Sequence, residues 1–111
     1  MNLDIKTTQE DSLTTVNLLG SLDSNTASLA EKEINLLIEN GAEKIIINLE
    51  KTDYVSSAGL RVFLSTAKKL MVKNGSVKLC KPNEVVTEIL EITGFNTIID
   101  VFSSYEDALK A

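Results

Sequence analysis

The chain has 111 residues, 43% of them hydrophobic and 24% charged, as expected of one soluble globular domain rather than a disordered segment. Its net charge of -5 argues against nucleic acid and anionic membrane as partners, because both are bound through clustered cations. Lys68, Lys69 and Lys73 form the one local basic group, which we expect to be a solvated helix face. The sequence shows no signal peptide and no membrane-spanning stretch, and its single cysteine suits a reducing compartment. We therefore expect one cytoplasmic domain over residues 1–111.

The first half of the chain alternates strand and helix patterns. Residues 3–8 and 13–19 alternate apolar and polar side chains around a polar turn, which predicts an antiparallel hairpin. Residues 20–25 break this alternation and supply turn and capping residues before a helix that ends at Asn40-Gly41. Residues 44–49 are apolar and β-branched, which predicts a buried strand.

The second half continues the alternation. The stretch from Asp53 to Arg61 leads from a strand into a helix and carries two serines at the junction. Residues 76–80 predict another strand, and Pro82 is expected in the first turn of a third helix. Residues 98–101 predict a last short strand, and Ser104 is expected to begin a small terminal helix.

This order predicts an α/β fold. We expect a mixed, mainly parallel sheet of four to five strands, with the N-terminal hairpin as its antiparallel edge and three to four helices packed on it. Loops that follow parallel strands gather at one edge of such a sheet. The segments 23–26 and 54–59 both precede helices in this manner, so we expect them to be neighbours.

Several kinds of chemistry are excluded by composition. The chain has no histidine and one cysteine, which rules out a Ser-His-Asp relay and a zinc site within it. It also lacks the acidic spacing of a calcium loop and a glycine-rich phosphate loop, so we expect no metal and no cofactor. A hydrolase that uses Asp23, Glu50 and Asp53 is the weakest hypothesis, because such carboxylates usually serve as helix caps and solvated charges.

Ser56 and Ser57 lie at or next to the start of the second helix. One interpretation is a plain helix cap, in which a hydroxyl accepts a backbone N–H. The other is a phosphoacceptor, since a helix N-terminus tolerates the charge of about -1.5 to -2 that a phosphoryl group adds. Arg61, the only arginine, follows Ser57 by one helical turn and could steady a phosphate, contact a partner or remain solvated.

Two motifs resemble the single-domain STAS proteins, the anti-sigma factor antagonists of bacteria. Residues 54–60, with the strand at 45–49 before them, resemble the phosphorylation segment of that family. Residues 20–27 resemble its second signature, a G-x-L-D-x-x-T-A loop before the first helix. The element order agrees along nearly the whole chain, so the resemblance predicts a STAS domain over residues 1–111.

The resemblance implies a switch rather than an enzyme. In that family the unphosphorylated antagonist binds an anti-sigma factor, which is itself a serine kinase, and thereby frees the sigma factor. Phosphorylation ends binding, and a PP2C-type phosphatase reverses it. The acceptor falls on Ser57; because Ser56 stands where well-known members carry aspartate, Ser56 is the alternative acceptor. The residues expected at the partner surface are Asp23, Ser24, Thr26, Tyr54, Val55, Ser56, Ser57, Ala58, Gly59 and Arg61.

Two other functions remain open on the sequence. The first is a STAS module that controls a phosphatase, a diguanylate cyclase or chemotaxis output in place of a sigma factor. The second is a module that binds a small ligand or a nucleotide at the edge between Asp23 and Ser57, although the missing phosphate loop argues against it.

Overall fold

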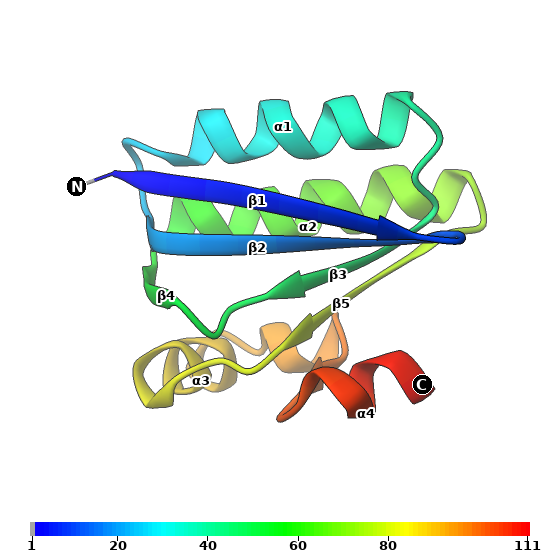
Figure 1. Cartoon of the computed structure of the whole chain (residues 1–111). Helices are drawn as coiled ribbons and strands as arrows, with labels where there is room; N and C mark the ends of the chain where they lie inside the picture. Colours follow the sequence, from blue (N-terminus) through cyan, green and yellow to red (C-terminus); the bar gives the residue numbers. More distant parts are fainter. Residues whose placement is uncertain (1) are drawn as a thin grey trace.

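The computed structural model describes residues 2–111 as a sheet with helices on both sides (Figure 1). In chain order the elements are β1 Leu3–Glu10, β2 Leu13–Leu22, α1 Ala27–Glu39, β3 Lys44–Asn48, β4 Thr52–Val55, α2 Ser57–Val72, β5 Ser76–Cys80, α3 Glu84–Ile92, the 3-10 turn η1 Phe95–Thr97, β6 Val101–Phe102 and α4 Tyr105–Lys110. Within this described part of the chain, no helix has the length and apolar character needed to cross a membrane.

The sheet confirms the predicted α/β class. Its main path runs β1-β2-β3-β5-β6, in which β1 pairs with β2 antiparallel and the remaining neighbours are parallel. The N-terminal hairpin is therefore the antiparallel edge, as expected. The sheet has six strands rather than four to five, because the short segment before α2 forms a strand of its own, β4, beside the end of β2.

β2 changes the strand with which it pairs at Gly20. Its first half pairs with β3 up to Asn17, and its last residues pair with β4, where Leu22 lies opposite Val55. The register shifts between Gly20 and the next residue, and Gly20 has a φ of +123°, a conformation that favours glycine. The prediction that the strand ends at residue 19 was wrong: Gly20 bends β2 into a new ladder instead of ending it.

The main core lies between one face of the sheet and the helices α1 and α2, and Val86 and Leu90 of α3 also belong to it. Alternate residues of each strand point to opposite faces, so Ile45 and Ile47 of β3 join this core while Ile46 faces the other way. Ile46 belongs to a smaller cluster with Cys80 and Ala108 under α4. The largest fully buried side chains are Phe63, Leu18, Leu22, Ile34, Ile45, Ile46, Ile47, Leu49, Leu70, Leu79, Leu90 and Val16.

The later helix starts confirm one prediction and correct another. Ser104 caps α4, since its Oγ accepts a hydrogen bond from the backbone N–H of Asp107 at 3.0 Å. In α3 the cap is Asn83, whose Oδ1 accepts from the N–H of Val86 at 2.7 Å. Pro82 therefore precedes the cap and is not in the first turn, because the Asn83 side chain takes the capping position.

Candidate functional site

The loop between β2 and α1 is held by two side chains. The Asp23 carboxylate accepts hydrogen bonds from the backbone N–H groups of Asn25 at 2.9 Å and Thr26 at 3.2 Å. The Thr26 hydroxyl donates to the Ser21 carbonyl at 2.7 Å and accepts from the Asp23 N–H at 2.9 Å. Thr26 is only 6% exposed, so it shapes the loop from inside and leaves Ser24 and Asn25 exposed at the tip.

The start of α2 lies directly against this loop's base. Val55 pairs with Leu22 across the β2–β4 ladder, and the Ser56 N–H donates to the Leu22 carbonyl at 2.9 Å. Gly59 approaches so closely that an added Cβ would lie 2.7 Å from the Leu22 carbonyl oxygen and 2.9 Å from a Val55 methyl. The expectation that the two loops are neighbours is thereby confirmed.

The two serines at this junction have different roles. Ser56 is the helix cap, and its half-buried hydroxyl accepts from the Gly59 N–H at 3.3 Å. Ser57 is the first residue of α2, and its exposed hydroxyl has no hydrogen-bond partner among residues 2–111. The capping interpretation thus applies to Ser56, which leaves Ser57 with the hydroxyl that faces solvent.

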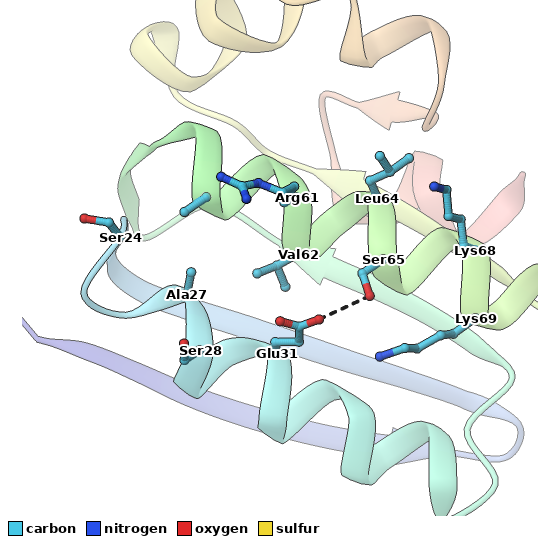
Figure 2. Close-up of a pocket in the computed structure, with 11 residues that line it drawn as sticks. Ser24, Ala27, Ser28, Glu31, Arg61, Val62, Leu64, Ser65, Lys68 and Lys69 are labelled. Atoms are coloured by element: carbon cyan, nitrogen blue, oxygen red, sulfur yellow. Dashed lines mark hydrogen bonds between the residues drawn. The ribbon is translucent and has the colours of Figure 1, made fainter.

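Two larger exposed side chains flank Ser57. Tyr54 in β4 is 45% exposed, and Arg61 lies one turn further along α2. Arg61 forms no ion pair within residues 2–111. It borders an open groove of about 570 Å³ between α1 and α2, which reaches the two loops at Ser24 and Ala58 (Figure 2).

Two of the three carboxylates named in the hydrolase hypothesis have partners of their own. Glu50 pairs with Lys81 at 3.5 Å, and the Asp23 carboxylate is engaged by its own loop. No cluster of three or more histidine, cysteine or acidic side chains within residues 2–111 could hold a metal ion. Burial raises the pKa of the Cys80 thiol from 9.0 to about 11, so the thiolate needed of a nucleophile is disfavoured.

Known proteins similar to this chain were found by sequence and by structure. The chain is 38% identical over 94 residues to BtrV of Bordetella bronchiseptica, covering 85% of this chain and 81% of BtrV. It is 31% identical over 110 residues to the anti-sigma-B factor antagonist of Bacillus subtilis, covering 99% of this chain and all of that protein.

A solved structure with the same fold is that of the Bacillus protein SpoIIAA. Its unphosphorylated form superposes with a TM-score of 0.82 at 21% identity, covering 96% of this chain and 93% of SpoIIAA. Its phosphorylated form gives a TM-score of 0.72 at 20% identity, covering 98% and 97%. At these identities the likeness concerns the fold. The family model described as "STAS domain" matches residues 4–108, nearly the whole chain, and the chain therefore belongs to the STAS domain family.

Proposed function

We propose that this protein is an anti-sigma factor antagonist whose binding to an anti-sigma factor is switched off by phosphorylation of Ser57. The observation that carries the proposal is the exposed Ser57 hydroxyl at the first position of α2, beside a serine already used as the cap. The Bacillus subtilis relative named an anti-sigma-B factor antagonist, which aligns over nearly the full chain, supports the same function.

In the unphosphorylated state the partner would contact the exposed residues around the junction. Ser24, Tyr54, Ser57 and Arg61 present side chains to solvent from two loops and one helix turn. The other expected site residues, such as Thr26 and the buried Val55 and Gly59, hold these loops in place. The partner is an anti-sigma factor that is also a serine kinase, and binding it releases the sigma factor.

Phosphorylation transfers the γ-phosphoryl group of ATP to Ser57 Oγ and releases ADP and the hydroxyl proton. The fold tolerates the new charge, because the first N–H groups and the dipole of α2 favour an anion and the first turn has no acidic residue. A partner that docks on this surface would meet a hydrated group of about -1.5 to -2 charges and dissociate. A PP2C-type phosphatase would hydrolyse the phosphoester and restore binding.

SpoIIAA, whose fold this chain shares, is known in phosphorylated and unphosphorylated forms, which supports the compatibility of the fold with phosphate. The direct test incubates the purified protein with the serine-kinase anti-sigma factor of its own organism and Mg-ATP, and maps phosphate by mass spectrometry. Ser57→Ala should remain unmodified, whereas Ser56→Ala should still be phosphorylated. Phosphate on Ser56 in the Ser57→Ala protein would move the switch to Ser56, and neither phosphate nor a complex would refute the function.

A further inference from the structure

One face of α2 carries a row of side chains that begins at Ser57 and is exposed except at the half-buried Leu64. We call Ser57, Arg61, Leu64, Lys68 and Met71 the α2 stripe; their spacing of four, three, four and three residues places them on one side of the helix. Met71 is 72% exposed, and Arg61 and Lys68 are also exposed. Arg61, Leu64 and Lys68 lie on the α2 border of the groove between α1 and α2, which all three line, and in Figure 2 they project from α2 on the side opposite Glu31. Ser65 instead points towards Glu31 of α1, with which it shares a hydrogen bond of 3.3 Å.

The α2 stripe is basic although the protein as a whole is acidic. The net charge of the chain is -5, yet α2 contains no aspartate or glutamate between Ser57 and Val72. Arg61 and Lys68 form no ion pair with any of residues 2–111, unlike Lys81, which pairs with Glu50 at 3.5 Å. The two cations of the stripe are thus available to another molecule.

We propose that the α2 stripe binds an acidic surface of the anti-sigma factor, with Arg61 and Lys68 facing carboxylates and Leu64 and Met71 facing apolar side chains. This inference rests on the proposed function, because the stripe extends the surface around Ser57 along the helix. An acidic protein fits better than DNA or a membrane, since those ligands need more cations than two and the remainder of this chain repels them.

An acidic partner also increases the loss of affinity that phosphorylation of Ser57 causes. A phosphate on Ser57 lies one helical turn from Arg61, at the spacing where opposite charges on a helix attract each other. It would therefore neutralise one cation of the stripe and at the same time repel the carboxylates of the partner. Both effects weaken the same contact, so one modification changes the surface from attractive to repulsive.

The test reverses the charges of the stripe in the full-length protein. Arg61→Glu/Lys68→Glu is compared with Lys6→Glu/Lys110→Glu, which gives the same net charge but alters exposed residues in β1 and α4. Affinity for the purified anti-sigma factor is measured by calorimetry, with circular dichroism as the check on folding. We expect the stripe variant to bind about 100-fold more weakly, roughly tenfold for each reversed charge, and the control to stay near wild type.

The neutral pair Arg61→Gln/Lys68→Gln provides a second measurement that does not depend on repulsion or on the folding of the reversed variant. It should bind about tenfold more weakly and lose most of the salt dependence of the wild-type association rate. Wild-type affinity in both stripe variants, with Ser57 phosphorylation still abolishing binding, would overturn this inference and leave the proposed function intact. Wild type that binds no anti-sigma factor would overturn both.

The remaining measurements test whether the wild-type protein binds double-stranded DNA or vesicles of equal parts phosphatidylglycerol and phosphatidylcholine. We expect no binding to either. Binding that Arg61→Glu/Lys68→Glu abolishes would assign the stripe to a polyanion or an anionic membrane and would overturn the acidic-protein partner.

Discussion

Gly59 provides the sharpest test of how the site is held together. It lies inside α2 and needs no positive φ, so its conformation alone does not demand glycine. The demand is spatial, because a methyl group would lie 2.7 Å from the Leu22 carbonyl oxygen, 2.8 Å from Leu22 Cγ and 2.9 Å from a Val55 methyl. The carbonyl belongs to the β2–β4 ladder and cannot turn away as a side chain can. Gly59→Ala should therefore push the start of α2 off the sheet.

Two opposing terms set the size of the effect. Overpacking a well-filled site costs about 1 to 3 kcal/mol, whereas alanine in place of glycine within a helix returns about 0.5 to 1 kcal/mol. Because the nearest atom is a backbone oxygen, the overpacking cost lies at about 2 to 3 kcal/mol, and after the helix gain of up to about 1 kcal/mol the net loss in the free energy of unfolding is about 1 to 2 kcal/mol. In a domain of about this size that corresponds to a fall of about 4 to 8 °C in Tm.

The assay is thermal and urea unfolding of Gly59→Ala followed by circular dichroism, with Ser57→Ala as the control. Ser57 is in the same helix turn but is exposed, so its replacement should change Tm by little. Gly59→Ala should also bind the anti-sigma factor more weakly, because Ser57 and Arg61 move with the helix. A Gly59→Ala protein as stable as wild type, or more stable, would refute the close approach as the reason for this glycine.

Three further substitutions or conditions test the site and the core. Ser57→Asp should abolish partner binding in calorimetry while leaving Tm within a few degrees, because a helix N-terminus accommodates an anion. Thr26→Val should cost about 1 to 3 kcal/mol in urea unfolding, because it leaves the Ser21 carbonyl and the Asp23 N–H without their partner. Cys80 should react slowly with a thiol reagent in the folded protein. Because the pKa is raised, the thiol keeps its proton to a higher pH in the folded state than in the unfolded chain. Ionisation of Cys80 therefore lowers the free energy of unfolding as pH rises from 9.0 to about 11.

Each of these outcomes has a matched control. A loss of stability in Ser57→Asp comparable to that of Gly59→Ala would contradict the tolerance of α2 for charge. Thr26→Ser keeps the hydroxyl and should recover most of the stability; equal losses in both Thr26 variants would contradict the two hydrogen bonds of the hydroxyl as the source of the effect. Cys80→Ala should lack the part of the alkaline decline that belongs to the thiol, and an identical pH profile would contradict the raised pKa.

The sequence predicted what depends on local patterns. Apolar periodicity located the helices and the buried strand at Ile45 and Ile47, and the rule for parallel strands predicted that the two loops meet. β4 was missed as a separate strand because it has only four residues, of which Asp53 and Tyr54 are exposed, and because its partner lies some thirty residues earlier. The strand was predicted to end before Gly20 because a glycine at a bulge and a glycine at a strand end look alike in the sequence.

Within the site, the separate roles of Ser56 and Ser57 could not be predicted. A helix start is uncertain by one or two residues when only the sequence is known, and that is the distance between the cap and the free hydroxyl. The burial of Thr26 was also invisible, because its acceptor is the Ser21 backbone carbonyl, which any residue would supply. The two motifs nevertheless pointed to the two loops that the structure brings together.

The pairing of β2 first with β3 and then with β4 has an evolutionary consequence. The spacing between the two loops is set by backbone ladders and by the tight contact at Gly59, neither of which involves the exposed side chains of Ser24, Tyr54 or Arg61. Those side chains can therefore be exchanged without altering the geometry that presents the Ser57 hydroxyl. Copies of such a domain that differ at these three exposed positions would present the Ser57 hydroxyl in the same geometry to different partners.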